Sequence, residues 1–185
     1  MSAFVIHTVD SAPEEARPLL EGAQKKFGFL PNLLGELAAA PAALQAYLTL
    51  GDLFARTSLS TVEQQLVLLS VSRANGCDYC TAAHSAGLTM AGFGRDQLAT
   101  LKTGQRLLDA RLEALRVFAT AIALNRGHVS ADELNAFLDV GYSRPQALEV
   151  LIGVAMKTLS NHTNHIATTP LDVQLQPFEW VPSLA

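Results

Sequence analysis

Charged residues, cysteines and long apolar runs are all scarce in this sequence, and each scarcity excludes a class of protein. Only 16% of the 185 residues are charged, against about 25% in an average soluble domain, and 49% are apolar. A chain this apolar is not intrinsically disordered, because it has enough apolar surface to form a core. The net charge of -4 argues against a nucleic-acid-binding surface or a polybasic membrane surface.

No apolar run has the length of a membrane span. The runs at residues 66–71 and 150–155 are far shorter than the roughly 18 residues that a transmembrane helix needs. Residues 1–10 contain no basic segment, no long apolar segment and no small-residue cleavage site, so they do not resemble a secretory signal. We therefore expect a cytoplasmic protein that does not bind membranes.

The apolar periodicity and the helix-boundary residues predict an all-α fold. Four Ser-x-x-Glu/Gln sequences are typical of capping boxes at helix N-termini, and they begin at Ser11, Ser60, Ser130 and Ser143. We expect Pro18 to delay or kink the first helix. The expected helices span residues 14–27, 31–40, 41–56, 61–74, 77–90, 95–103, 110–126, 131–140 and 144–167.

The sequence contains no linker that would separate two domains. We expect one domain over residues 1–185, with its core at about residues 26–172. Residues 170–185 contain three prolines and Trp180 and lack a helical period. We expect them to form an extended tail that lies on the body of the protein or on a neighbouring subunit.

The two cysteines, Cys77 and Cys80, stand at the start of the helix predicted after Asn75-Gly76. Free amides and the positive end of the helix dipole favour a thiolate there. The spacing of three residues puts both sulfur atoms on one helix face, close enough for a disulfide. His84 lies one turn beyond Cys80 on the same face and leans back over its sulfur. This geometry favours Cys80 as the nucleophile, Cys77 as the resolving thiol and His84 as the base.

Two other interpretations of the cysteine pair stay open. Both cysteines are apolar enough to be simple core residues. A zinc site would need a further ligand, which His162 or His165 would have to supply, but their spacing is one residue short of the usual zinc-finger pair. We favour a polar helix end near a subunit contact as the setting of these two histidines.

The run from Glu63 to His84, with its Cys-x-x-Cys-x-x-x-His core, resembles the AhpD-like alkylhydroperoxidase branch of the carboxymuconolactone decarboxylase family. Residues 29–32, 40–41 and 161–172 extend the likeness to most of the chain. The resemblance implies an all-helical, AhpD-like fold and a homo-oligomer, commonly a trimer or hexamer. It also implies a cycle in which Cys80 attacks a peroxide, Cys77 resolves the sulfenic acid, and a histidine with an upstream glutamate relays protons.

The sequence departs from that family pattern at two positions. Gln65 stands twelve residues before the first cysteine, where the family has the relay glutamate. Glu63 lies on a different face of the same helix, about 200° away, and is equally well explained as the capping partner of Ser60. Tyr79 replaces a histidine before the second cysteine, where its hydroxyl either orients a substrate oxygen or packs. Because a neutral glutamine is not a base, the departure at Gln65 weakens the expectation of strong peroxidase activity.

The preferred hypothesis is a thiol-dependent peroxidase that reduces organic hydroperoxides through a Cys77–Cys80 dithiol/disulfide cycle. It needs no metal and no organic cofactor, but it needs an external dithiol reductant, which is a thioredoxin-like or lipoyl-carrying protein. We place its substrate pocket near Phe54, Leu66 and Leu69. The alternatives are a non-cycling redox sensor or oligomeric scaffold, a carboxymuconolactone decarboxylase-type acid–base enzyme, and a zinc-stabilised binding module.

Overall fold

The computed structural model describes residues 4–180, and every regular element in that range is helical. The all-α prediction is therefore confirmed. Nine α-helices and two 3-10 helices follow one another in the described chain: η1 (Glu14–Ala16), α1 (Arg17–Phe27), α2 (Asn32–Leu37), α3 (Pro41–Phe54), α4 (Thr61–Ala74), α5 (Asp78–Met90), α6 (Arg95–Lys102), α7 (Ala110–Leu124), α8 (Ala131–Asp139), α9 (Arg144–Ala167) and η2 (Val173–Phe178).

Three of the four predicted capping boxes are confirmed. Ser60, Ser130 and Ser143 each accept a hydrogen bond from the amide three residues later, and the Glu or Gln at that position accepts one from the serine amide. These reciprocal bonds satisfy amides that would otherwise lack partners at the starts of α4, α8 and α9. The local sequence is therefore sufficient to set these three helix starts.

The capping box predicted at Ser11 is wrong. Its hydroxyl oxygen accepts a hydrogen bond from the amide of Thr8 at 2.9 Å and so closes a turn before the helix. The first regular turn, η1, follows Pro13, and α1 begins only at Arg17 with Pro18 in its first turn. The delayed start follows from the missing amide proton of proline, which is tolerated only where no helical hydrogen bond is due.

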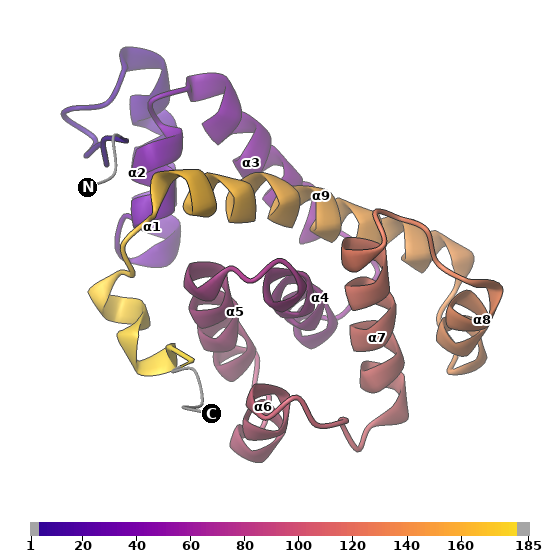
Figure 1. The fold of residues 1–185 in the computed structure, drawn as a ribbon. Helices are drawn as coiled ribbons and strands as arrows, with labels where there is room; N and C mark the ends of the chain where they lie inside the picture. Colours follow the sequence, from indigo (N-terminus) through magenta and orange to yellow (C-terminus); the bar gives the residue numbers. More distant parts are fainter. Residues whose placement is uncertain (1–3, 181–185) are drawn as a thin grey trace.

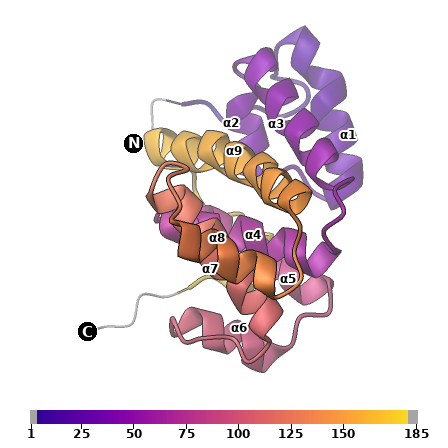
Figure 2. The same cartoon turned by 90° about the vertical axis from the view of Figure 1, so that its right-hand side faces the viewer.

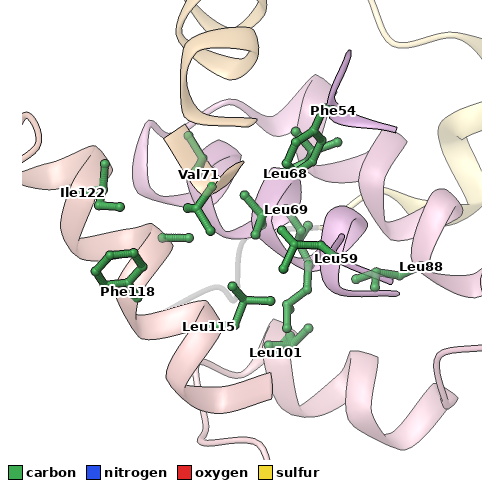
Figure 3. Close-up of a cluster of buried hydrophobic side chains, with 14 of the residues drawn as sticks. Phe54, Leu59, Leu68, Leu69, Val71, Leu88, Leu101, Leu115, Phe118 and Ile122 are labelled. Atoms are coloured by element: carbon green, nitrogen blue, oxygen red, sulfur yellow. The ribbon is translucent and has the colours of Figure 1, made fainter. Parts of the chain in front are cut away.

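Helix α4 forms the centre of the fold and packs against α5, α7 and α9. Figure 3 shows Leu68, Leu69 and Val71 of α4 in the main apolar cluster, together with Leu115 and Phe118 of α7. Burial of each side chain of this size contributes about 1.5–3 kcal/mol before conformational entropy is subtracted. These contacts hold α4 rigidly, and α4 in turn positions the elements around it.

Helix α9 separates the N-terminal helices from the group formed by α4 to α8. Figure 1 and Figure 2 show it between α3 on one side and α4 on the other, and it packs closely on both. A second apolar cluster gathers side chains from α1, α2, α3 and α5, and it includes Cys77 and Cys80. The cysteine pair therefore lies within the second cluster rather than at the surface.

The C-terminal segment is less extended than predicted. Residues 173–178 form the 3-10 helix η2, which packs on α5 and carries Pro177 within it. Trp180 is buried, and its indole nitrogen donates a hydrogen bond to the hydroxyl of Ser85 on α5 at 2.8 Å. The prediction that this segment lies on the body of the protein holds up to Trp180, and the last part of the predicted tail, 181–185, falls outside the described residues.

In the part of the chain that the structure describes, no helix combines the length and the apolar character that crossing a bilayer requires.

Candidate active site

The turn between α4 and α5 places both cysteines at the start of α5. Gly76 has a φ of +67°, a left-handed conformation that glycine adopts without strain, and it directs the chain from one helix into the next. Cys77 is the N-cap of α5, and its amide donates a hydrogen bond to the carbonyl of Ser72 at 2.9 Å. Cys80 follows in the first turn, and both thiols are free and buried. The predicted position of the pair is therefore observed.

Helix α9 supplies the polar atoms that contact the two sulfur atoms. The side-chain nitrogen of Asn164, Nδ2, donates hydrogen bonds to Cys80 Sγ at 3.1 Å and to Cys77 Sγ at 3.4 Å. Ser160 Oγ lies 3.8 Å from Cys80 Sγ. A thiolate is stabilised by such donors, because each one lowers the electrostatic cost of the buried negative charge.

Lys157, also on α9, brings a positive charge to the same place. Its side chain is completely buried, and its Nζ has no hydrogen-bond partner among residues 4–180. Burial by itself would raise the pKa of the Cys80 thiol, but the hydrogen bond from Cys77 and the charge of Lys157 lower that pKa well below its ordinary value. The pKa of Cys77 is raised, first by its hydrogen bond to Cys80 and then by burial. Of the two thiols, Cys80 is therefore the one whose surroundings favour a thiolate.

His84 faces Gln65 across the gap between α5 and α4. Its Nδ1 lies 3.0 Å from the side-chain oxygen of Gln65. Because that oxygen only accepts, Nδ1 carries the ring proton and Nε2 is the free basic nitrogen. Burial, followed by the charge of Lys157, lowers the pKa of His84 well below its ordinary value. His84 is therefore neutral at physiological pH, and Gln65 fixes its orientation and tautomer.

Glu63 takes no part in this arrangement. Its carboxylate accepts hydrogen bonds from the amide of Ser60 at 2.8 Å, the hydroxyl of Tyr142 at 2.7 Å and the guanidinium of Arg111 at 3.2 Å. Of the two interpretations of Glu63, the capping partner is the one that the structure contains. The residue that contacts His84 is Gln65, at the position where the family has its relay glutamate.

Tyr79 is held by contacts of its own. Its hydroxyl donates a short hydrogen bond to the carboxylate of Asp172 and accepts one from the amide of Leu33 at 3.4 Å. Burial and the neighbouring carboxylate raise the pKa of Tyr79. The hydroxyl thus joins α5 to α2 and to the segment before η2. Of the two roles left open for Tyr79, this geometry favours packing.

A cavity of about 570 Å³ opens beside Cys80. Its polar lining includes Gln65, His84 and Lys157, whereas its walls are largely apolar and include Phe27, Phe29, Tyr47, Phe54, Leu68 and Met156. Phe54 was predicted to line the pocket and does so. The prediction was wrong for Leu66 and Leu69, because α4 turns both side chains into the apolar core and presents Leu68 to the cavity.

Among the described residues, no group of side chains is arranged to bind a metal ion. His162 and His165 are both exposed on the last turns of α9, with ring centroids 6.5 Å apart. Within residues 4–180 there is no cluster of three or more histidine, cysteine or acidic side chains that would hold a metal ion. The geometry of the described residues therefore gives the zinc hypothesis no support.

The sequence interpretation missed the three α9 residues that contact or face the cysteines. Lys157, Ser160 and Asn164 follow one another at spacings of three and four residues, which puts them on one helix face. The same spacing continues back to Gly153 and Val150, which are buried. A lysine on an otherwise buried helix face was the available signal, because lysine is almost never fully buried unless it is paired.

The comparisons with known proteins agree with this geometry. Residues 39–116, which contain both cysteines and His84, match the model of the carboxymuconolactone decarboxylase family. This matched segment makes up less than half of the chain. The family resemblance found in the sequence is confirmed over that segment, and the solved structures below confirm the AhpD-like fold. No curated protein sequence matches the chain.

Solved structures with the same fold align with nearly the whole chain. An alkylhydroperoxidase AhpD core, a peroxidase-related protein from Ralstonia eutropha JMP134, has a TM-score of 0.81 at 23% identity and covers 94% of each chain. The debrominase Bmp8 in complex with 2,3,4-tribromopyrrole has a TM-score of 0.80 at 18% identity, covering 96% of this chain and 97% of that one. A peroxidase-related protein from Silicibacter sp. TM1040 has a TM-score of 0.80 at 21% identity, covering 94% and 93%. At such identities the likeness shows the fold.

Proposed function

We propose that the protein is a thiol-dependent peroxidase that reduces apolar organic hydroperoxides. The observation that carries this proposal is the sulfur of Cys80, which lines a largely apolar cavity, shares the side-chain amide donor of Asn164 with a second thiol, Cys77, and has surroundings that lower its pKa. A peroxidatic thiolate needs a low pKa, access to substrate and a resolving partner. The cavity walls favour a hydroperoxide with an apolar substituent over a small polar peroxide.

The cycle follows from the positions of the two thiols. The Cys80 thiolate attacks the terminal oxygen of the hydroperoxide, the O–O bond breaks, and the products are a Cys80 sulfenic acid and an alcohol. Cys77 then attacks the sulfenic sulfur, and a Cys77–Cys80 disulfide forms with loss of water. An external dithiol carrier, thioredoxin-like or lipoyl-carrying, restores both thiols by disulfide exchange. No step of this cycle requires a metal or an organic cofactor.

A decarboxylase-type reaction on an anionic lactone fits the site less well. Such a substrate would need a cluster of basic side chains, and the described residues that line the cavity supply Lys26 and Lys157 among many apolar groups. Lys157 is already the counter-ion of Cys80.

Reductive dehalogenation is a second candidate, because the fold is shared with a debrominase and the cavity suits an apolar ring. In that reaction the Cys80 thiolate takes the halogen as a sulfenyl halide while a proton replaces it on the ring. Cys77 then displaces halide to give the same disulfide. Both candidates predict the same oxidised protein, so the substrate consumed is what separates them.

The test is a rapid-mixing experiment on fully reduced protein. One equivalent of cumene hydroperoxide, or of a brominated pyrrole in a parallel reaction, is added, and free thiols are alkylated and counted by intact mass over time. We expect fast loss of both thiols with the hydroperoxide, no loss in Cys80→Ser, and a trappable sulfenic acid in the matched variant Cys77→Ser. Equal, undiminished turnover in the two variants would exclude the dithiol mechanism. A single slow oxidation that no dithiol reverses would instead indicate the redox sensor.

A further inference from the structure

Lys157 is a buried charge whose main support is the neighbouring Cys80. Its side chain is fully enclosed by α9 and its neighbours, and its Nζ has no hydrogen-bond partner in the described part of the chain. The titratable groups that face it from α3 and α5 are Tyr47, Cys77, Cys80 and His84. Burial acts against the ammonium, and the strongest favourable influence on it is the charge of the Cys80 thiolate.

We infer that Lys157 is the general acid of the reaction, which releases its proton when Cys80 is oxidised and regains one when the disulfide is reduced. The role in substrate turnover rests on the proposed function. The proton release itself rests only on the enclosure of Lys157 and on the charge of Cys80.

The reason for the release is the loss of the counter-ion. A sulfenic acid and a disulfide are both neutral, so oxidation of Cys80 removes the negative charge that supports the buried ammonium. An uncompensated buried charge neutralises rather than persists. The other nearby groups do not replace the thiolate: burial raises the pKa of the Tyr47 phenol, and Cys77 is a thiol until it reacts.

Neither His84 nor a carboxyl group of residues 4–180 is placed to give a proton to the leaving oxygen. The Nδ1 proton of His84 is directed to Gln65, and its Nε2 carries none. Among the described residues that line the cavity there is no aspartate or glutamate. Glu63 is held by Ser60, Tyr142 and Arg111 and faces elsewhere. Lys157 lines the cavity beside Cys80, and it therefore lies close to the oxygen that leaves.

Lys157 gives up one proton in each cycle and regains it, and this balances the protons of the reaction. In the first step, the Cys80 thiolate and ROOH give the sulfenic acid and an alkoxide, which takes the proton of the Lys157 ammonium to become ROH. In the second step, the Cys77 thiol condenses with the sulfenic acid, its hydrogen leaves in water, and the products are the disulfide and a neutral Lys157 amine. Reduction by an external dithiol then supplies two protons: one returns to Cys77 as a thiol and the other converts Lys157 back to the ammonium.

The number of protons taken up on reduction tests this inference in the unmodified protein. If Lys157 is neutral in the disulfide form and charged in the dithiol form, reduction takes up two protons for two electrons. The equilibrium constant then changes about a hundredfold per pH unit, which corresponds to about 59 mV. If Lys157 keeps its proton throughout, the change is about tenfold per pH unit, or about 30 mV. These changes refer to the half-reaction of the protein. The measurement uses dithiothreitol redox buffers at neutral pH, with alkylation and intact mass as the readout. Because reduction of dithiothreitol itself takes up two protons at this pH, the exchange constant should be independent of pH if Lys157 releases its proton and should change about tenfold per pH unit if Lys157 keeps it.

The thiolate absorbance near 240 nm is recorded on the same reduced samples. Two protons together with a thiolate signal support the inference. One proton overturns it, and so does a two-proton result without a thiolate, because then Lys157 has no counter-ion to lose. Since no hydroperoxide is used, a protein that fails to reduce hydroperoxides would refute the proposed function and leave this result on Lys157 standing.

Two substitutions separate the charge of Lys157 from its proton. Lys157→Arg keeps a cation that does not deprotonate in proteins, so we expect the thiolate to persist while single-turnover oxidation by cumene hydroperoxide slows at least tenfold. Lys157→Met removes both the charge and the proton, so the thiolate signal is expected to fall as well. If the Lys157→Arg protein keeps its thiolate and is oxidised by cumene hydroperoxide as fast as the unmodified protein, Lys157 is not the general acid.

Discussion

Two buried charges of opposite sign stand on neighbouring helices, and they are stabilised in opposite ways. Glu63 on α4 accepts hydrogen bonds from Ser60, Arg111 and Tyr142. Lys157 on α9 has no hydrogen-bond partner in the described chain and faces the Cys80 thiolate. A charge held by several fixed donors belongs to the architecture, whereas a charge held by one oxidisable partner changes when that partner reacts.

The same contrast appears in the pKa values of the two sites. Burial by itself would raise the pKa of Glu63, but hydrogen bonds from Ser60 and Tyr142 and the charge of Arg111 lower it below its ordinary value. Burial by itself would lower the pKa of Lys157, and the thiolate raises it. Folding alone fixes the first charge, and the redox state fixes the second. Four experiments sharpen or break this comparison.

The largest effect is expected for Lys157→Met. Removal of the cation raises the pKa of Cys80 toward or above that of an ordinary thiol, and it also removes the proton donor, so oxidation by a hydroperoxide at neutral pH should slow about a hundredfold. The free energy of unfolding should change little, because a buried cation is replaced by an apolar side chain of similar length and Cys80 takes up a proton instead of staying an unpaired thiolate. Stopped-flow oxidation and urea unfolding measure the two quantities. A large loss of stability with unchanged rate would reverse the assignment.

Glu63→Ala is expected to do the opposite. It removes the capping box of α4 and the acceptor of Arg111 and Tyr142, so we expect a loss of about 2 kcal/mol of stability. The rate constant for thiol oxidation should change little, since Glu63 does not reach the cavity. Glu63→Gln, which keeps the shape and a capping oxygen, is the matched control and should lose less. A rate that falls as steeply as in Lys157→Met would restore Glu63 as a relay residue.

Gly87→Ala tests the contact between Gln65 and His84 with a smaller effect. A methyl group at Gly87 would collide with the side-chain oxygen of Gln65, which must then leave Nδ1 of His84. Loss of one hydrogen bond is worth about 1 kcal/mol, so we expect about a fivefold slower oxidation. Gly22→Ala on α1, where a methyl group meets open space, is the control. Equal rates in both variants would show that the orientation of His84 is unimportant.

The smallest effect concerns stability in acid. The folded pKa of His84 lies below its unfolded value of about 6.5, so the unfolded state takes up a proton first as the pH falls. Stability should therefore fall below about pH 6.5, by at most about 1.4 kcal/mol per pH unit for this group. His84→Gln should flatten that slope, and His128→Gln, at an exposed site, should not. Parallel slopes in all three proteins would contradict a neutral, buried His84.

The sequence was a good guide wherever a local signal determines the structure. The serine caps set the starts of α4, α8 and α9, and Asn75-Gly76 places Cys77 and Cys80 in the first turn of α5. The box at Ser11 failed because its hydroxyl forms a competing turn with Thr8. The fold class and the position of the dithiol were therefore predictable.

The sequence did not reveal contacts that depend on how the helices cross. Helix α4 is buried on nearly all sides, so periodicity did not show that Leu68 rather than Leu66 or Leu69 meets the cavity. Lys157 is 77 residues from Cys80 in the chain, and only the passage of α9 over α5 brings its charge to the sulfur. The proximity of Lys157 to Cys80 is therefore a feature of the tertiary structure that the sequence pattern did not predict.

The pKa of Cys80 is the measurement that tests the central claim most directly. The rate of alkylation by iodoacetamide is followed against pH in Cys77→Ser, where Cys80 is the remaining cysteine, with and without Lys157→Met. We predict that the first protein titrates well below an ordinary thiol and that loss of Lys157 moves the midpoint upward by at least about one pH unit. Identical midpoints in the two proteins would show that Lys157 does not hold the thiolate and would contradict the account.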